Sequence, residues 1–261
     1  IDSMDLQIAL MLAQDGVVNG AIYALMALAL VLVFSVTRII FIPQGEFVSF
    51  AALSMAALQA GKLPQVVWML IGLAVITLLV EGWRHLRGLR VDWMSTLVWT
   101  VLLPLVAAGL VFGLQPSSQW AQTLAVLALI TPMGPLLYRL AFRPLAHATV
   151  LVLLIVSVAL HGVLVGLGLV FFGAEGSRTT AFSDARWDLG GLPITGQSLV
   201  VIAATALLLV AMFVFFERSI IGKALHATAI NRVGARLMGI PTELAGDMSS
   251  ALAAVIGAIC D

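Results

Sequence analysis

Long apolar runs, separated by short polar stretches, set the pattern of this chain. A run of about 20 apolar residues is long enough to cross the hydrocarbon core of a membrane as an α-helix. The pattern predicts eight membrane segments, at roughly residues 16–37, 44–60, 63–80, 94–114, 120–142, 149–173, 198–216 and 246–260. We therefore predict an all-α, polytopic transmembrane fold, with a single domain over residues 1–261.

Two of these segments are unusually short. The segment at 44–60 opens with Pro43, Gln44 and Glu46, which favours a broken or tilted helix. The last segment holds only about 15 residues before the chain stops at Asp261, fewer than a spanning helix needs. We therefore expect the chain to be truncated at its C-terminus.

Basic residues are distributed unevenly among the connections, which predicts the orientation. Cytoplasmic loops of membrane proteins carry an excess of Lys and Arg. With the N-terminus outside, most of the 13 basic residues fall on the inner side. They are Arg38, Arg84, Arg87, Arg90, Arg139, Arg143, Arg218, Lys223, Arg232 and Arg236. Only Lys62, Arg178 and Arg186 remain outside, so we predict a multi-pass membrane protein with its N-terminus outside.

Composition supports the membrane assignment and narrows the chemistry. Hydrophobic residues make up 62% of the chain and charged residues 10%, against about 25% charged residues in water-soluble domains. The single cysteine excludes an internal disulfide. The sequence contains no P-loop, no H-E-x-x-H and no G-x-S-x-G motif. We expect no enzymatic activity and no cofactor bound by this chain; membrane lipid is an expected partner and nucleic acid is not.

Three polar residues near the start of the first segment could face a solute. Asp15 and Asn19 lie four residues apart on one helical face, and Tyr23 continues that face by one turn. Polar groups inside a membrane are costly, which makes them functional candidates. The alternative is that Asp15 is hydrated at the outer interface while Asn19 bonds to a neighbouring helix.

Two further polar positions lie at the inner end of the second segment. Gln44 and Glu46 begin this segment, where a carboxylate is stabilised by the helix dipole and the free N–H groups. This capping role competes with a second hypothesis, in which the pair gates the cytoplasmic mouth of a pathway. His161, in the middle of an apolar helix, is more typical of an interhelical contact than of a proton relay.

The polar stretch 217–245 interrupts an otherwise apolar half of the chain. Within it, Asn231 is a good N-cap, and Gly239 followed by Pro241 is a good stop. These signals predict a helix of about two turns over 232–238. Residues 219–229, just upstream, can form another short helix.

The predicted helix at 232–238 has two distinct faces. Arg232 and Arg236 lie one turn apart, while Val233 and Leu237 form an adjacent apolar strip. A small amphipathic helix of this kind can lie on lipid or bind in a groove of another protein. Since the chain has no P-loop, an ATPase would have to be a separate subunit.

Four blocks of the sequence resemble the permease subunits of branched-chain amino-acid (hydrophobic amino acid uptake) ABC importers. The family patterns are N-G-x-x-x-G-x-x-Y-A-L, N-F-A-H-G-[DE], E-R-x-A-Y-R-P and G-R-A-x-R-A-x-A-E-D followed by L-x-G-I. The matching blocks are DGVVNGAIYAL (15–25), FIPQGE (41–46), YRLAFRP (138–144), GKALHATAIN (222–231) and LMGI (237–240). Their shared order over residues 15–240 makes the resemblance specific.

The resemblance implies a transport function and a set of partners. It implies import of branched-chain amino acids or related small polar solutes by alternating access. The partners would be a second permease, two cytoplasmic ATPase subunits that hold ATP and Mg²⁺, and a periplasmic or extracellular solute-binding protein. The implied pathway residues are Asp15, Asn19, Tyr23, Gln44 and Glu46. The implied ATPase-coupling residues are Asn231, Arg232, Val233, Arg236, Leu237, Met238 and Gly239.

The chain also departs from the family patterns. Gln44 replaces the family histidine, and Ile230-Asn231 replaces an acidic pair, which keeps a helix cap but removes charge. The segments 63–80 and 94–114 have no counterpart, so 63–114 is predicted to be an inserted helical hairpin. The family also continues with more helices beyond the position of Cys260.

Two other functions are compatible with the sequence. One is an ATP-independent secondary transporter or channel, which would need buried charges to sense an ion gradient. Few candidates for such buried charges exist in the sequence: Asp15, Glu46, His161 and Asp247. The other is a transport-inactive assembly subunit.

Overall fold

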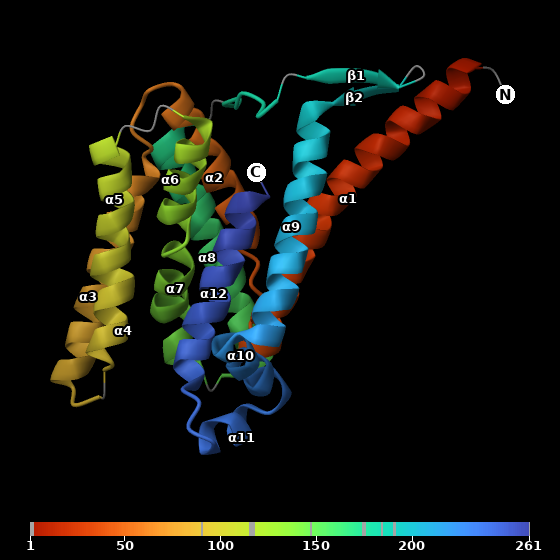
Figure 1. Ribbon diagram of the computed structural model, residues 1–261. Coiled ribbons are helices and arrows are strands. Elements are labelled where there is room, and N and C mark those ends of the chain that lie inside the picture. The colour runs from red at the N-terminus through yellow and green to blue at the C-terminus, as the bar shows by residue number, and fades with distance from the viewer. Residues whose placement is uncertain are drawn as a thin grey trace.

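The computed structural model describes residues 3–89, 91–114, 118–146, 148–173, 176–183, 185–189 and 192–260, and it is almost entirely helical (Figure 1). The helices are α1 (Ser3–Thr37), α2 (Gln44–Gln59), α3 (Val66–Leu86), α4 (Trp93–Leu97), α5 (Leu103–Leu114), α6 (Gln119–Ile130), α7 (Met133–Leu137), α8 (Val150–Phe172), α9 (Gly196–Arg218), α10 (Ile220–Ile230), α11 (Arg232–Leu237) and α12 (Thr242–Ile259). The predicted all-α, polytopic fold is confirmed.

The structure has 7 helical segments, within the part of the chain that it describes, that are long and apolar enough to cross a membrane. Helix α2, the remaining segment of the eight predicted, has only 16 residues, in agreement with the short helix expected there. The predicted start of the first segment was wrong, because α1 begins at Ser3 rather than near residue 16. The apolar residues that precede Asp15 continue the helix, and no proline interrupts it.

Successive spans run in opposite directions between two ends of the molecule (Figure 1). The connections after α1, α3, α7 and α9 gather at one end, together with α10 and α11. We call this the arginine-rich end, because it carries Arg84, Arg143, Arg218, Arg232 and Arg236. The opposite end carries the N-terminus and a β-hairpin. The connections that the sequence predicts to lie on the inner side are therefore all at one end of the molecule.

Helix α12 lies at the centre of the bundle and packs on α1, α2 and α7. The window of α12 that could span a membrane is 67% buried, whereas that of α9 is 11% buried. Close packing in the centre depends on small residues. A Cβ atom on Gly134 of α7 would lie 2.2 Å from the backbone oxygen of Ser250 in α12. The central helices therefore touch backbone to backbone, and α9 forms a flank.

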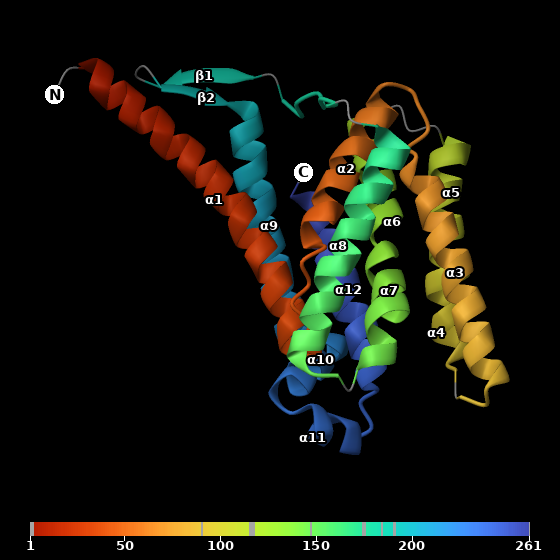
Figure 2. The same cartoon turned by 180° about the vertical axis from the view of Figure 1, so that it is seen from behind.

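Helices α1 and α9 form an arm that diverges from the rest of the bundle towards the N-terminal end (Figure 2). They contact each other, and near the arginine-rich end α1 also contacts α10 and α12. Their outward sides expose large apolar residues, among them Val17 and Leu207. A surface of this kind suits a hydrocarbon environment or another membrane-embedded subunit.

The connection between α8 and α9, at the end opposite the arginine-rich end, contains a feature that the sequence did not predict. Strands β1 (Arg186–Leu189) and β2 (Leu192–Thr195) pair antiparallel, with Trp187 opposite Ile194. An aromatic residue opposite a β-branched residue stabilises such a pair. This connection is therefore partly a hairpin, and Trp187 in it is exposed, as is typical of tryptophan at a membrane interface.

Two spans are interrupted near prolines. A π-helical segment, Val98–Leu102, joins α4 to α5 just before Pro104, which has no N–H group to donate to the preceding turn. A second π-helical segment, Tyr138–Phe142, follows α7 and passes into a 3₁₀ turn, Arg143–Leu145. The second irregularity carries the buried arginine of the candidate site.

Candidate functional site

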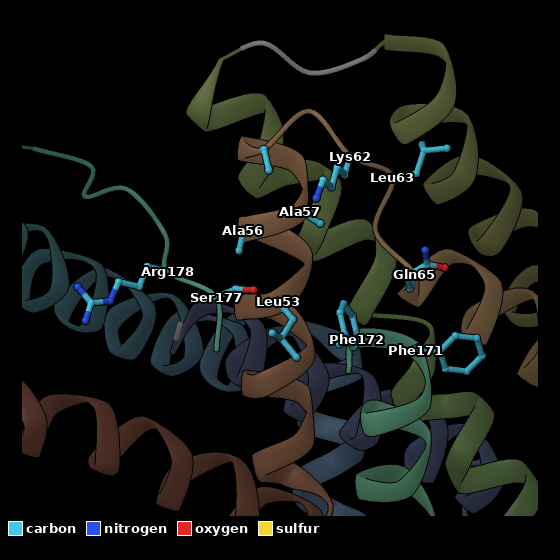
Figure 3. Close-up of a pocket in the computed structure, with 11 residues that line it drawn as sticks. Leu53, Ala56, Ala57, Lys62, Leu63, Gln65, Phe171, Phe172, Ser177 and Arg178 are labelled. Atoms are coloured by element: carbon cyan, nitrogen blue, oxygen red, sulfur yellow. The ribbon is translucent and has the colours of Figure 1, made fainter. Parts of the chain in front are cut away.

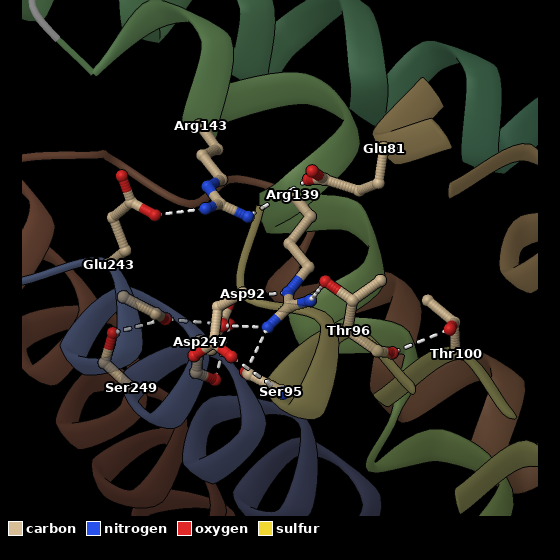
Figure 4. A network of polar contacts seen from close by, with 12 residues as sticks. Glu81, Asp92, Ser95, Thr96, Thr100, Arg139, Arg143, Glu243, Asp247 and Ser249 are labelled. Atoms are coloured by element: carbon tan, nitrogen blue, oxygen red, sulfur yellow. Dashed lines mark hydrogen bonds and ion pairs between the residues drawn. The ribbon is translucent and has the colours of Figure 1, made fainter. Parts of the chain in front are cut away.

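A buried ion pair joins two central elements near the arginine-rich end (Figure 4). The Nε of Arg139 donates to Oδ1 of Asp247 at 3.0 Å, and Nη2 donates to Oδ2 at 2.5 Å. The two side chains are only 2% and 4% exposed. This bidentate geometry is the arrangement in which a guanidinium binds a carboxylate most strongly.

Helix α4 completes the coordination of the same guanidinium. Arg139 donates from Nη1 to Oγ1 of Thr96 at 3.1 Å and from Nη2 to Oγ of Ser95 at 2.6 Å. Asp92 holds these hydroxyls in place by capping α4, since its side chain accepts from the N–H of Ser95. Arg139 therefore connects its own π-helical segment to both α12 and α4.

A second cluster of charges surrounds Arg143, one helical turn further on. Its Nη1 lies 3.0 Å from Oε1 of Glu81 in α3, and its Nη2 contacts Glu243 in α12. Glu81 also accepts from Arg84 at 3.0 Å and is 1% exposed. The two clusters together connect α3, α4 and α12 to the helix that ends in Arg143.

The predicted coupling helix is confirmed as a helix with the expected cap. The side chain of Asn231 accepts from the N–H of Gly234 at 2.9 Å, and α11 follows. Gly239 ends the turn with φ of 83°, a backbone conformation that favours glycine. Helix α11 stops at Leu237, one residue earlier than predicted, so Met238 lies in the turn. The upstream helix is also confirmed, since α10 follows the cap Ser219.

The apolar strip of α11 is exposed. Val233 and Leu237 are 71% and 83% exposed, and Met238, in the turn that follows, is 84% exposed. Helix α11 projects beyond the end of the bundle, next to the connection that enters α12 (Figure 1). On the other face, Arg236 donates to Oγ1 of Thr242, the first residue of α12, at 3.1 Å. The helix is therefore held to α12 by Arg236, while its apolar face is mostly exposed.

The predicted pathway residues fall into two separate groups. Asp15, Asn19 and Tyr23 are exposed on the diverging half of α1. Gln44 begins α2, after Thr37 ends α1. Since Tyr23 lies about 20 Å along the helix from that end, at 1.5 Å per residue, the structure does not bring the two groups together.

Gln44 and Glu46 make contacts that the sequence did not predict. Gln44 is 4% exposed and donates from Nε2 to the carbonyl of Ala253 in α12 at 2.8 Å. Glu46 lies across from α8, with Oε1 3.1 Å from Nδ1 of His161, although the two groups are not aligned as a hydrogen bond. The interhelical contact expected for His161 is thus present and involves the first turn of α2.

The two charge clusters were missed by sequence reasoning, which assigned Arg139 to an inner loop. That assignment was wrong, because Arg139 lies in a helical segment and is buried. A signal was present: Arg139 and Arg143 are four residues apart, and so are Glu243 and Asp247. Matched pairs of opposite charge at this spacing can face each other on two helices.

A cavity of about 400 Å³ lies at the opposite end of the bundle, between the end of α2 and the end of α8 (Figure 3). Its lining is mostly apolar, and includes Leu53, Phe171 and Phe172, with Lys62 and Arg178 as cations. The connection beside it is held by Gln59, whose Oε1 accepts from the N–H of Thr180 at 2.8 Å. The cavity is large enough for a small solute but faces the end where the β-hairpin lies.

Comparison with known proteins adds no family assignment. No family model, curated protein or solved structure matches the chain. Within the ranges that the structure describes, no three His, Cys, Asp or Glu residues come together in a group that could hold a metal ion.

Proposed function

We propose that this chain is a permease subunit of an ATP-driven importer in a bacterial inner membrane. The observation that carries the proposal is α11, a capped amphipathic helix that projects from the bundle with its apolar strip exposed. An apolar helix face in water is unfavourable unless another surface covers it. A groove on a cytoplasmic ATPase subunit is the cover that the family resemblance implies.

The contacts around α11 provide a route from that helix to the spans. Arg236 binds the first residue of α12, and the next turns of α12 carry Glu243 and Asp247. These two carboxylates bind Arg143 and Arg139, which belong to the helix after α7. A displacement of α11 by ATPase closure would therefore move α12 against its neighbours, as alternating access requires.

The remaining partners follow from the same proposal. Two ATPase subunits, which hold ATP and Mg²⁺, would dock at the arginine-rich end, which is then cytoplasmic in accord with the positive-inside rule. A second permease would pack against this one, and a solute-binding protein would dock at the opposite end, which places the N-terminus outside. Branched-chain amino acids or related small polar solutes are the cargo that the resemblance implies.

The test is whether an ATPase subunit co-purifies through the apolar strip. We expect the tagged wild-type protein, extracted from its native membranes in mild detergent, to carry a P-loop ATPase that mass spectrometry identifies. The triple variant Val233→Ala, Leu237→Ala and Met238→Ala should co-purify with at least about tenfold less ATPase. The reason is that truncating each interface anchor removes more than about 1 kcal/mol of binding free energy.

The matched control truncates an exposed apolar patch on another helix. Leu207→Ala, Val210→Ala and Val214→Ala change three residues of α9 that are 72%, 60% and 48% exposed. This variant should carry as much ATPase as wild type. If wild type carries no ATPase, or if the α11 variant carries as much as wild type, the proposal is wrong and the ATP-independent alternatives gain support.

A further inference from the structure

A second cavity, of about 450 Å³, opens at the arginine-rich end beside α11. It lies between the last turns of α3, the segment that follows α7, helix α11 and the start of α12. Four arginines and one carboxylate line it: Arg84, Arg143, Arg232, Arg236 and Glu243. Such a concentration of guanidinium groups around one cavity is costly unless anions offset it.

The carboxylates in and behind the cavity offset only part of this charge. Glu81 binds both Arg84 and Arg143, and Glu243 binds Arg143. Arg232 and Arg236 have no carboxylate partner in the described chain. The four guanidinium groups therefore exceed the two carboxylates, and the excess lies on the α11 side.

Two donors of the cavity also have no acceptor. The Nε atoms of Arg143 and Arg232 are buried without a hydrogen-bond partner among the described residues. The side chain of Arg143 is only 8% exposed, so bulk water reaches it poorly. A buried N–H group without an acceptor is unfavourable, and oxygen atoms of an anionic ligand would satisfy both groups.

The rest of the cavity wall is mostly apolar. It is formed by Val80, Trp83 and Leu89, at and just after the end of α3, and by Tyr138, Pro144 and Ala146; Trp83 is 55% exposed. The guanidinium of Arg87 lies 3.8 Å above the ring of Trp83. Exposed tryptophan beside arginine at the end of a spanning helix is typical of the headgroup level of a bilayer. The cavity therefore offers apolar contacts beside its cationic groups.

We propose that this cavity binds the phosphate group of an anionic membrane phospholipid. Guanidinium groups bind phosphate oxygens in pairs, and basic pockets between spanning helices bind lipid headgroups in this way. The headgroup would lie between Arg84 of α3 and Arg232 and Arg236 of α11, with its acyl chains along the apolar side of α3. Lipid would then connect the hairpin that contains α3 with α11, without any requirement for an ATPase.

The experiment measures binding of fluorescent phosphatidylglycerol to the purified full chain in neutral detergent. We expect saturable binding that unlabelled phosphatidylglycerol or cardiolipin displaces and phosphatidylcholine does not. The variant Arg84→Gln/Arg236→Gln should bind about 30-fold more weakly, the factor expected when two arginine–anion contacts are lost. The variant Arg84→Lys/Arg236→Lys keeps the charge, but lysine lacks the paired donors. Its affinity for the lipid should therefore lie between those of wild type and of the glutamine variant.

The control changes the same charge at the same end but outside the cavity. Arg218→Gln/Lys223→Gln removes two exposed cations of α9 and α10 and should bind as wild type does. If this control and Arg84→Gln/Arg236→Gln lose lipid affinity equally, the protein is attracted to anionic lipid by its overall charge and the proposal is overturned. Displacement of the lipid by millimolar inorganic phosphate would identify a soluble phosphate as the ligand and overturn the lipid assignment. Binding of phosphatidylcholine equal to that of phosphatidylglycerol would overturn it as well.

Discussion

At the scale of single residues, the ion pair of Arg139 and Asp247 is the most constrained feature of the molecule. Both side chains are almost fully buried, and hydroxyl groups of Ser95 and Thr96 complete the coordination. Removing one partner of such a pair leaves an uncompensated buried charge, whereas replacing both with apolar groups is often tolerated. The pair therefore specifies which helices meet more than it adds net stability.

This reasoning predicts a non-additive pair of substitutions. Asp247→Leu should lower the stability of the purified protein by about 3–5 kcal/mol, because Arg139 stays buried without its partner. Adding Arg139→Met should restore a large part of that loss. Unfolding titrations in mixed micelles would measure both variants. Asp15→Leu, which replaces an exposed carboxylate of α1, should change stability little. A double variant less stable than Asp247→Leu would contradict the prediction.

At the scale of elements, the hairpin over 63–114 is attached to the core by charges as well as by packing. Its helix α3 contacts α7 and contributes Met69 and Leu70 to the hydrophobic core. Glu81 of α3 binds Arg143, and α4 binds Arg139. Helix α3 also pairs with α5, and the polar contacts of α3 and α4 complete the coordination of both central arginines.

Glu81→Ala should loosen this hairpin without unfolding the bundle. The substitution removes the acceptor that Arg84 and Arg143 share, so the hairpin should open more often. Hydrogen exchange of backbone amides in α3 and α4 should quicken by about 5- to 30-fold, the factor that 1–2 kcal/mol produces, while α12 is unchanged. Glu217→Ala, at an exposed carboxylate of the same end, serves as the control. Uniform acceleration throughout the chain would argue against a local role.

At the scale of the whole molecule, burial divides the helices into a centre and a flank. The α6–α7 span and α12 are mostly buried, whereas α1, α8 and α9 expose most of their surface. The two charge clusters lie in the centre, and α11 lies beyond it at the arginine-rich end. In the proposed importer, the ATPase would push on this end while the flank slides against lipid or the second permease.

Reconstituted transport distinguishes the proposed importer from a secondary transporter. We expect leucine uptake into vesicles that contain the chain with its partner permease, ATPases and binding protein to require ATP. Vanadate should reduce uptake to background, and ionophores that dissipate ion gradients should leave it unchanged. Uptake by the chain alone, driven by an ion gradient and insensitive to vanadate, would instead establish the secondary transporter.

The sequence by itself determined the spans, the caps and helix α11. These features depend on patterns that are local in the sequence. They are the length of the apolar runs, the helix cap Asn231 and the helix stop at Gly239. Helix α11 and most span boundaries therefore fell within a few residues of prediction. The early start of α1 was missed, because polar Asp15 and Gly16 resemble a boundary but do not break a helix.

Only the tertiary structure decided which polar groups meet. Arg139 and Asp247 are separated by 108 residues, and no local pattern specifies which of several helices Arg139 faces. The same holds for the contact of Glu46 with His161 and for the cavity beside α11, which four separate segments line. Polar groups in an apolar bundle must find partners, but packing of small residues such as Gly134 determines which partners come within reach.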